Sequence, residues 1–566
     1  MFTDRFKVYS SMEKVMIDAM PKVEELQSAQ ILKNERFSFQ IAYEFEPGIV
    51  DRLYPVSFEI KSDLADYISV RKVGYVPSEM PLYPGKKDDS VISDKPGLYP
   101  DVLYPMDKNV IYPHETMHDS LWFTLDTEGR ADAGIYDISV EFKYEKRFND
   151  ETKEDIIHTC TKSISVEIID VELPKQNLTY SQWFHTDCIA SHYNLETFSE
   201  RHWEIIENFM RVAVKNGHTT ILTPLHTPPL DTAIGGERPT TQLVDITLEG
   251  DTYSFGFEKL DRWIDLALKI GYKYIDTPHL FTQWGAKYCP KIMATVDGEY
   301  KRIFGWDCES TSERYRHFLS QYLPALTNYF EKRGLKDVTW FHCSDEPRAH
   351  SIEQYMAAKS GAEKYLEGWY IGDALSDVEF RKAGVLKNVS TPTYRAQEFF
   401  DASFRDISIY YCSGHKDYYS NRFFAYHLWR TRVLGLQLYR EGITSFGSWG
   451  YNFYYLEESV GVINPYLTTD GGRAFPSGDA FSVYPAPDGS CLESIRLVSF
   501  YEGVQDYTAL ELLESYIGKE EVYKLIDDVA GMRVTFNKYP CGAFFIQSLR
   551  RRVNNLIKEY AKKENE

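Results

Sequence analysis

The sequence predicts a multidomain β and α/β protein: an N-terminal antiparallel β-sandwich followed by a (β/α)8 TIM-like barrel with C-terminal helices. The length of 566 residues exceeds one ordinary domain. Up to about residue 174 the chain shows the period-two alternation of strands, and from about residue 177 short apolar runs alternate with long helical patterns. We therefore expect domains at residues 1–174, 175–455 and 456–566, the last a hairpin and helices packed on the barrel.

The first domain is expected to be a sandwich because its strand-like segments are short and are separated by turn residues. One further stretch, residues 10–20 (SSMEKVMIDAM), has a helical pattern. The predicted strands are rich in Val, Ile, Phe and Tyr and cover residues 35–45, 53–62, 120–127, 134–145 and 162–174.

The second domain is expected to be a barrel because eight strand candidates occupy about 270 residues, close to the roughly 250 of a typical (β/α)8 barrel. A doubly wound open sheet would also alternate strands and helices, but with five or six units and a Gly-rich turn after its first strand. The strand candidates are residues 177–184, 218–224, 273–279, 337–344, 369–375, 388–393, 407–414 and 443–449.

Helical patterns lie between these strands. Three of them end at Gly217, Gly271 and Gly334, where the end of a helix favours a residue that adopts a left-handed backbone. After the eighth strand a long loop, a hairpin and three helical patterns complete the chain. The main helical patterns of the barrel are residues 199–217, 257–271, 311–334 and 423–442.

Composition narrows the function. The net charge of −21 opposes binding to nucleic acid, and no stretch approaches the roughly 18 continuous apolar residues of a membrane span. The N-terminus has no signal-peptide pattern, and the eight cysteines are scattered without a C-x-x-C motif, so we expect a cytoplasmic location. Aromatic residues make up 15% of the chain, and although most fill cores, Tyr and Trp also suit the faces of sugars.

Two adjacent carboxylates, Asp345 and Glu346, follow directly on the fourth predicted strand, in the stretch VTWFHCSDEPRAH. Acidic residues are favoured at helix N-termini, so a simple helix start is one interpretation. However, a capping box over Ser351–Gln354 places the helix start about five residues later. The pair is therefore expected in a loop at the carboxyl end of the barrel, where barrel enzymes carry their chemistry.

The adjacency of the pair restricts the chemistry. Ordinary glycosidases need two carboxyl groups that face each other across the sugar, roughly 5 to 9.5 Å apart. Neighbours on one turn cannot easily do so, but one can protonate the leaving oxygen while the other holds a 2-acetamido group that acts as the nucleophile. Such intramolecular attack reaches effective molarities of about 10⁵–10⁸ M. Because other strand ends carry Asp187, Asp276, Asp373 and Asp417, a conventional retaining glycosidase with Asp276 or Asp417 as nucleophile is an alternative.

Further sugar contacts are expected from residues at the same ends of the strands. For each Trp, core packing is an equally good interpretation, and His342, on the fourth strand itself, is expected to be a satisfied core histidine. No H-E-x-x-H, P-loop or G-x-S-x-G motif occurs, so we expect no metal and no organic cofactor. The candidates for substrate binding are Trp183, His185, His226, Trp284, Tyr394 (to the acetamido carbonyl), Trp449, Tyr451 and Asn452.

Three stretches resemble the β-N-acetylgalactosaminidases of glycoside hydrolase family 123. They are WFHCSDEP after the fourth strand, WGYNFY after the eighth, and GDAFSVYP…SIRLVSFYEGVQDY beyond it, and the sandwich–barrel layout is similar as well. The resemblance implies an exo-acting, retaining enzyme that hydrolyses terminal β-linked GalNAc, as on glycosphingolipid oligosaccharides, through an oxazolinium intermediate. It assigns Glu346 as general acid/base, and Asp345 as the residue that orients the acetamido N–H and stabilises the oxazolinium.

Two alternatives remain open. A β-N-acetylhexosaminidase of family 20 type uses the same mechanistic logic. A non-catalytic carbohydrate-binding protein on a barrel scaffold is the other, although loss of one carboxylate would be expected there and both are present. The sequence leaves the oligomeric state undefined.

Overall fold

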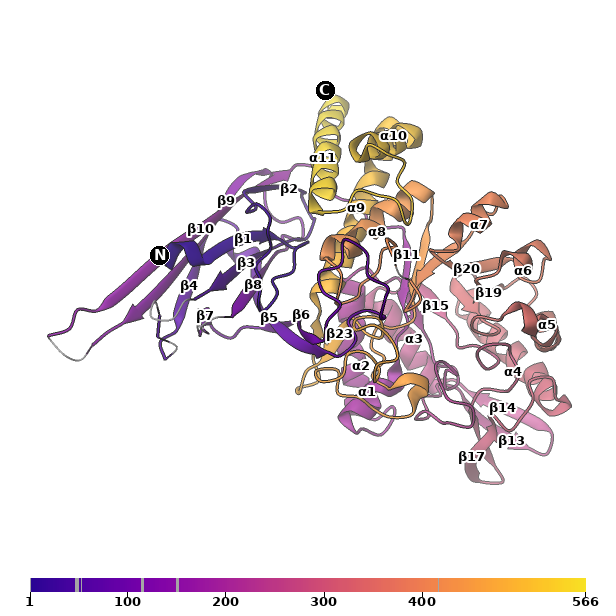
Figure 1. Cartoon of the computed structure of the whole chain (residues 1–566). Helices are drawn as coiled ribbons and strands as arrows, with labels where there is room; N and C mark the ends of the chain where they lie inside the picture. The colour runs from indigo at the N-terminus through magenta and orange to yellow at the C-terminus, as the bar shows by residue number, and fades with distance from the viewer. Residues whose placement is uncertain are drawn as a thin grey trace. The chain divides into compact units, whose positions relative to one another are not determined.

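The structure is a computed structural model of the chain (Figure 1). None of its helices is both long enough and apolar enough to cross a membrane, within the residues that the structure describes. Those residues are 2–45, 50–51, 53–112, 114, 117–148, 152–415 and 417–565.

The chain forms two compact units. Each unit is built from more than one segment, because the chain returns to the first unit twice after it has entered the second. Compactness differs from independent folding, so the division into domains at 1–174, 175–455 and 456–566 stays a prediction. The first unit comprises Met1–Asn177, Ser420–Glu441 and Leu492–Glu566, and the second comprises Leu178–Tyr419 and Gly442–Cys491.

The N-terminal part of the first unit contains two five-stranded sheets, in the orders β1-β3-β8-β5-β6 and β2-β10-β9-β4-β7. The described pairs are antiparallel except β2 with β10, which is parallel. Apolar side chains from both sheets form one core, as the period-two pattern requires. The strands are β1 (Phe6–Ser10), β2 (Ser28–Leu32), β3 (Phe37–Glu44), β4 (Val56–Lys61), β5 (Ile68–Ser78), β6 (Gly97–Pro105), β7 (Val110–Ile111), β8 (His118–Leu125), β9 (Gly134–Lys146) and β10 (Ile156–Ile169).

The helical pattern of residues 10–20 does not form a helix. After β1 the chain turns, and an isolated bridge joins Met16 to Ala19. The residues from Ser11 to Val15 are all buried, so this stretch has no exposed face of the kind that a surface helix presents. The Gln40 side-chain amide donates to the Glu13 carbonyl at 2.7 Å, which satisfies the backbone without a helical ladder.

Four helices also belong to the first unit, and the three helical patterns predicted near the C-terminus are confirmed. Gly435 of α8 and Gly503 of α9 allow these two helices to approach closely. Arg432 of α8 links them by ion pairs with two carboxylates of α9. A two-stranded sheet of β23 (Val483–Pro485) and β24 (Cys491–Glu493) supplies the predicted hairpin. The helices are α8 (Leu428–Glu441), α9 (Ile495–Ile517), α10 (Lys519–Ala530) and α11 (Ala543–Asn565).

The second unit is a nearly closed barrel of eight parallel strands in the order β11-β22-β21-β20-β19-β18-β15-β12. Between β12 and β11, Thr219 N donates to Tyr180 O at 2.9 Å. All eight predicted strands are confirmed. They are β11 (Thr179–Gln182), β12 (Thr220–Leu222), β15 (Tyr274–Asp276), β18 (Thr339–Phe341), β19 (Tyr370–Ala374), β20 (Asn388–Pro392), β21 (Ser408–Tyr411) and β22 (Ser445–Ser448).

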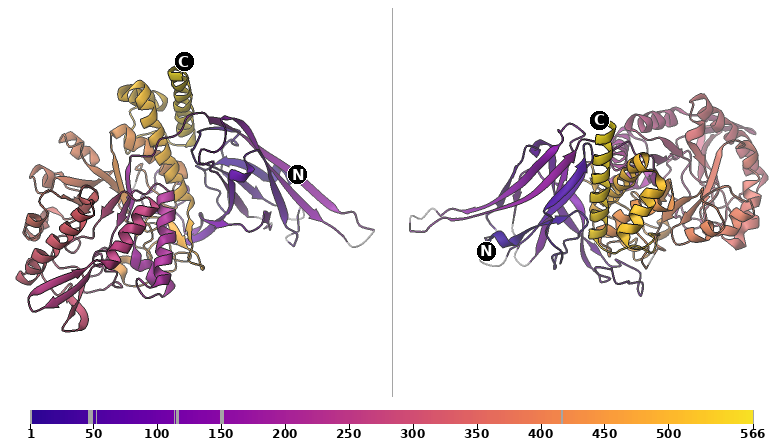
Figure 2. Two further views of the ribbon diagram at one scale, coloured as in Figure 1. Left: turned by 180° about the vertical axis from the view of Figure 1, so that it is seen from behind. Right: turned by 90° about the horizontal axis from the view of Figure 1, so that it is seen from above.

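Helices surround these strands, as the view from above in Figure 2 shows. Ser199 and Ser312 cap two of them, each by accepting a hydrogen bond from a backbone N–H three residues later. Gly217, Gly271 and Gly334 have positive φ angles of 86°, 122° and 68°, which confirms the predicted helix ends. The helices of this unit are α1 (Thr186–Tyr193), α2 (Glu200–Lys215), α3 (Glu258–Ile270), α4 (Glu313–Lys332), α5 (Ile352–Lys359), α6 (Val378–Lys382) and α7 (Ala396–Asp401).

A four-stranded sheet that the sequence analysis missed grows from two loops of the barrel, after β12 and after β15. Its order is β14-β13-β16-β17, and Gly250 and Gly298 turn its two hairpins with φ angles of 59° and 83°. The two segments alternate in period two around a Gly turn, which is a hairpin signal. The strands are β13 (Asp245–Glu249), β14 (Thr252–Gly256), β16 (Ile292–Val296) and β17 (Glu299–Phe304).

Candidate active site

A cavity of about 280 Å³ lies within the barrel. Its lining includes residues at both the first and the last positions of the strands, so it follows the barrel axis. Most barrels fill this axis with bulky branched side chains, whereas this lining contains small hydroxyl side chains beside the aromatic Trp340, Tyr370 and Phe446. Hydroxyl groups in this part of the lining come from Thr179, Thr220, Ser408 and Ser445.

Asp345 and Glu346 line this cavity just beyond β18. The next helix, α5, begins at Ile352, which confirms that the pair lies in a loop rather than in a first helical turn. The predicted capping box is wrong in detail, because the Ser351 hydroxyl bonds to the Arg348 backbone and caps nothing. Glu346 has a φ of 41°, a backbone conformation that non-glycine residues adopt rarely and that often marks functional sites.

Glu346 is held by a tyrosine from another strand. The Tyr410 hydroxyl, at the end of β21, donates a hydrogen bond to Glu346 Oε1. Burial, and then the charge of Glu346, raise the pKa of Tyr410 well above its usual range. Tyr410 therefore stays protonated and acts as a donor that fixes the direction of the Glu346 carboxyl group.

The Asp345 carboxylate lies beside Glu346, and no described residue forms a hydrogen bond with it. Burial, followed by the charges of Glu346 and Asp373, raises the pKa of Asp345 well above its usual range, whereas His342 acts in the opposite direction. The backbone of the residue is fixed, since its carbonyl accepts from Trp284 N at 2.8 Å. The carboxylate is thus positioned by its backbone and remains available to a ligand.

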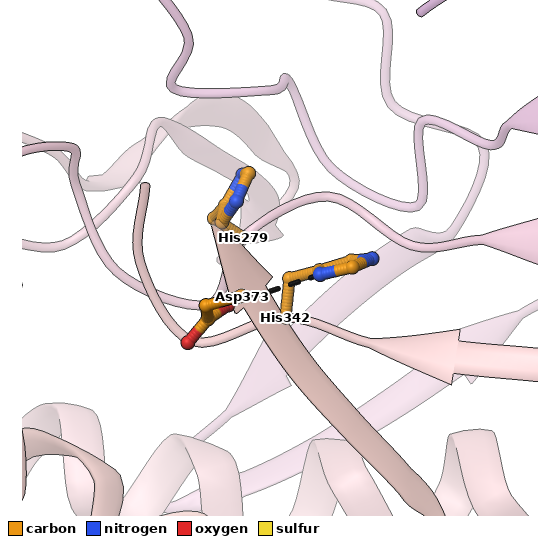
Figure 3. Close-up of side chains that lie close together, drawn as sticks. All are labelled: His279, His342 and Asp373. Atoms are coloured by element: carbon orange, nitrogen blue, oxygen red, sulfur yellow. Dashed lines mark ion pairs between the residues drawn. The ribbon is translucent and has the colours of Figure 1, made fainter. Parts of the chain in front are cut away.

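His342 directly follows β18, three residues before Asp345, and both of its ring nitrogens face acceptors. Nδ1 donates to the Gly372 carbonyl, and Nε2 lies 2.7 Å from Asp276 Oδ1. Asp373 Oδ1 is 3.8 Å from Nδ1, the contact that the dashed line in Figure 3 marks. His342 is thus hydrogen-bonded as expected, but it also lines the cavity.

The side chains in Figure 3 are also the group that could hold a metal by spacing. Ligand atoms of His279, His342 and Asp373 lie within 4.8 Å of one another. However, a ring nitrogen that donates a hydrogen bond has no lone pair to offer a metal, and His342 Nδ1 donates to a carbonyl while Nε2 faces a carboxylate. The oxygens of Asp373 accept from Cys343 N at 2.8 Å and from the Tyr355 hydroxyl at 2.6 Å. This geometry is that of a hydrogen-bond network, and the expected absence of a metal or cofactor stays a prediction.

Three predicted tryptophans line the cavity, namely Trp183, Trp284 and Trp449. Trp284 is 45% exposed and has a φ of 60°. Trp449 donates from Nε1 to Asp479 Oδ2 at 2.9 Å, and Trp183 lies edge-on to His279, with ring centroids 5.6 Å apart. Their rings are among the aromatic groups of the cavity wall that could stack against a sugar.

His185 and Asn452, two other candidates for substrate binding, connect loops beneath the cavity surface and do not line the cavity. The His185 backbone N–H donates to Asn452 Oδ1 at 2.8 Å, and His185 Nε2 donates to the Trp449 carbonyl at 2.8 Å. Burial lowers the pKa of His185 to about 4, so its ring is neutral. Both side chains are buried and neither is part of the lining, so they support Trp449 rather than reach the cavity.

Three further candidates do not line the cavity either. Tyr451 is fully buried and donates to the Phe209 carbonyl at 3.0 Å. His226 is buried and donates from Nε2 to the His279 carbonyl at 3.0 Å. Tyr394 is 38% exposed and packs edge-on to His415, with ring centroids 4.8 Å apart.

Sequence reasoning missed several polar residues of the cavity wall, and three of them act on the residues described above. His279 follows β15 and is buried, and neither of its ring nitrogens has a hydrogen-bond partner among the described residues. Asp231 accepts from Glu458 N at 3.0 Å, and burial raises its pKa to about 6. The third is Tyr410. His279 and Tyr410 stand within predicted strand segments, so their positions were a usable signal, whereas Asp231 lies in a loop without any.

Comparison with known proteins identifies the family. The profile of the glycoside hydrolase 123 catalytic domain matches residues 183–513. Among solved structures, a family 123 glycoside hydrolase from Clostridium perfringens, described for glycolipid glycan hydrolysis, is similar with a TM-score of 0.70 and 15% identity. The match covers 99% of this chain and 98% of that one. At this identity the likeness shows the fold.

Other similarities are too weak to support an argument. Xylanase 10C from Cellvibrio japonicus has a TM-score of 0.35 at 8% identity, covering 89% of this chain and 98% of that one. A family 10 xylanase from Thermobacillus composti has a TM-score of 0.31 at 12% identity, covering 58% and 97%. No curated protein sequence matches the chain.

The family match covers more than half of the chain, including the loop that carries the carboxylate pair, and the fold agrees along the whole length. The chain is therefore a glycosidase that belongs to glycoside hydrolase family 123, as the resemblance of its motifs implied.

Proposed function

We propose that this protein is an exo-acting, retaining β-N-acetylgalactosaminidase, which removes terminal β-linked GalNAc from glycosphingolipid-type oligosaccharides through an oxazolinium intermediate. The observation that carries the proposal is the difference between two neighbouring carboxyl groups in one cavity. Glu346 is held by Tyr410, whereas the Asp345 carboxylate has no hydrogen-bond partner among the described residues. The first suits proton transfer and the second suits a substrate N–H.

Glu346 would act as general acid and base. Its carboxyl group protonates the glycosidic oxygen as the bond breaks, and it then takes a proton from the water that attacks the intermediate. The hydrogen bond from Tyr410 leaves the other carboxyl oxygen of Glu346 for the substrate. General acid catalysis of this kind contributes roughly 10²–10⁴-fold in rate.

Asp345 would accept a hydrogen bond from the acetamido N–H. This contact turns the acetamido oxygen toward C1, and the negative charge offsets the positive charge that develops on the oxazolinium ring. Because that charge is larger in the transition state than in the bound substrate, the benefit appears in kcat.

The alternative is a conventional retaining mechanism, in which a carboxylate of the enzyme replaces the acetamido group as nucleophile. Asp276 is the main candidate for that role, because it lines the cavity. Its carboxylate, however, lies 2.7 Å from His342 Nε2, and a nucleophile tied in this way is weakened. Asp417, the other acid considered, is not among the residues of the cavity wall. The preference for GalNAc over GlcNAc rests on the family and on the glycolipid substrate of the Clostridium perfringens relative. A hexosaminidase of family 20 type is therefore the alternative on substrate.

The experiment compares matched aryl β-GalNAc, β-GlcNAc and β-Gal substrates on wild-type protein and on Asp345→Asn. We expect GalNAc to be cleaved best, the plain galactoside to be inert, and Asp345→Asn to lose about 10²–10³-fold in kcat, as for loss of a preorganised charge contact. A thiazoline mimic of the intermediate should bind far more tightly than GalNAc. Comparable cleavage of the plain galactoside, or a trapped covalent glycosyl-enzyme at Asp276, would refute substrate assistance. Preferred cleavage of the GlcNAc substrate would refute the assignment of the sugar.

A further inference from the structure

The contacts of His342 constrain its protonation state. The Gly372 carbonyl can only accept, so Nδ1 must carry a proton. Nε2 lies 2.7 Å from Asp276 Oδ1, a distance that requires a second proton between the two atoms. The pair is therefore either an imidazolium with a carboxylate, or a neutral imidazole with a protonated Asp276.

The surrounding charges favour the imidazolium. Asp276 faces the ring from β15 and Asp373 faces it from β19. Asp345 and Glu346 lie in the loop after β18, the strand that His342 itself follows. Two neutral titratable groups lie near the ring as well. His279 has its ring centroid 5.3 Å away and a pKa that burial lowers well below its usual range, and Tyr370 has a pKa that burial, Asp276 and Asp373 raise. None of the described residues that line the cavity is a Lys or Arg. His342 is thus the group that can supply a positive charge among these carboxylates.

The pKa values of His342 and Asp345 show that the histidine and the carboxylates around it favour each other's charged forms. Burial lowers the pKa of His342, but the charge and hydrogen bond of Asp276 and the charge of Asp373 raise it, to about 9. In return, His342 lowers the pKa of Asp345, which burial, Glu346 and Asp373 raise. The charge on His342 therefore favours the ionised form of Asp345.

We infer that His342 is an imidazolium in the resting protein, and that it is a positioning residue whose buried positive charge favours the ionised form of Asp345 against the opposing effects of burial and of the neighbouring carboxylates. The second half of this inference rests on the proposed function, because an ionised Asp345 matters only if it holds the acetamido N–H. The first half is a statement about one histidine and holds for any reaction at this site.

The protonation state is tested without activity. Ring signals of 15N- and 13C-labelled histidines are followed by NMR in the wild-type protein. His202 and His226 are internal references, since each donates to a carbonyl at 3.0 Å, neither lines the cavity, and burial lowers the pKa of each to about 4. Exposed histidines lose their proton near pH 6.5. Because His118 also pairs with a carboxylate, that of Glu44 at 3.0 Å, an imidazolium signal that persists at about pH 8 is assigned to His342 by its loss in His342→Gln.

We expect that signal, and we expect His342→Gln to remove it. Its absence from the wild-type spectrum at about pH 7 would overturn the inference even if the variant does not fold. Addition of Zn²⁺ tests whether His279, His342 and Asp373 form a metal site instead. Addition of about one equivalent should leave the signal in place, whereas loss of the His342 and His279 signals together would identify a metal site instead.

The effect on Asp345 is tested by the pH dependence of kcat. Without the cation, Asp345 ionises only at higher pH, so His342→Gln should move the acidic limb of the profile upward by about one pH unit or more, with a tenfold loss below the limb for each unit. Activity should recover partly toward pH 8. A uniform loss with an unchanged profile would show a merely structural role. If the plain galactoside were cleaved while the NMR signal persisted, the proposed function would fail and the charge on His342 would stand.

Discussion

At the scale of single residues, the catalytic proposal depends on the fact that two neighbours in the chain have different surroundings. Glu346 has a left-handed backbone, with a φ of 41°, which turns its side chain toward Tyr410. Asp345 has no such partner and remains near Asp373 and His342. Separation of the properties of two carboxyl groups by their environments is how acid and acceptor roles are assigned in glycosidases.

The role of Glu346 is tested by its leaving-group dependence. Glu346→Gln should lower kcat by roughly 10²–10⁴-fold for a poor leaving group, because the amide cannot protonate the departing oxygen. An activated aryl leaving group needs little protonation, so its loss should be much smaller. Steady-state kinetics on the two substrates measures the difference.

Glu353→Gln is the matched control, since Glu353 is an exposed residue of α5 in the same part of the chain. It should leave both rates unchanged. Equal losses on both substrates in Glu346→Gln would remove Glu346 from the acid role.

At the scale of elements, the packing of α8 against α9 depends on glycine. A Cβ atom added to Gly435 would meet the Gly503 carbonyl oxygen at 1.9 Å, and one added to Gly503 would meet the Arg432 carbonyl oxygen at 2.5 Å. Three residues before Gly435 along α8, Arg432 forms a bidentate pair with Asp506 of α9, at 2.7 and 2.9 Å. The glycines allow the close approach, and the ion pair links the two helices beside it.

Gly435→Ala should therefore destabilise the protein, although alanine is the better helix former by about 1 kcal/mol. The clash is with backbone, which cannot rotate away, and overpacking of a core costs roughly 1–3 kcal/mol or more. We expect the clash to win and the midpoint of thermal unfolding to fall. Ser515→Ala, at an exposed position of α9, is the control and should be close to neutral. A rise in the midpoint for Gly435→Ala would mean that the helices can separate at no cost.

At the scale of the whole molecule, charge restricts the substrates. The chain carries a net charge of −21, and the cavity wall contains five carboxylates, at Asp231, Asp276, Asp345, Glu346 and Asp373. His342 and His279 are the histidines of that wall, and none of its described residues is a Lys or Arg. The negative electrostatic potential of these carboxylates disfavours the approach of an anionic substrate, and dissolved salt screens this effect.

A neutral aryl β-GalNAc should therefore be cleaved faster than its 6-sulfated analogue, by about tenfold or more in kcat/KM, which corresponds to roughly 1.4 kcal/mol of discrimination. The difference should shrink as ionic strength rises from low salt to about 1 M, because the Debye length falls to roughly 3 Å. Equal rates at low salt would show that the sulfate position lies outside the field of the site.

Much of the fold follows from local patterns. The alternation of apolar residues, the Ser residues before α2 and α4, and glycines such as Gly271 are each encoded within a few positions, and they predicted all eight barrel strands and the main helix ends. The pair at Asp345 and Glu346 could also be located in this way, because its members are adjacent and follow a strand whose end faces the active side of any such barrel.

The direction of individual side chains could not be predicted in this way. His185 and Tyr451 stand near strand ends just as Trp183 and Trp449 do, yet their polar atoms bond to loop and helix backbone and leave the cavity to the tryptophans. Residues 10–20 have a helical pattern and still form turns, since five consecutive residues are buried there. In each case packing against distant segments overrode the local preference.

By itself, the sequence determined the strands, the helices, the order of the units along the chain and the position of the carboxylate pair, because each depends on residues close together in the chain. Only the tertiary structure decided which groups surround the pair. Tyr410 is 64 positions from Glu346, and Asp276 is 66 positions from His342. Contacts over such separations form only when several strands have closed into one barrel, so no local pattern contains them.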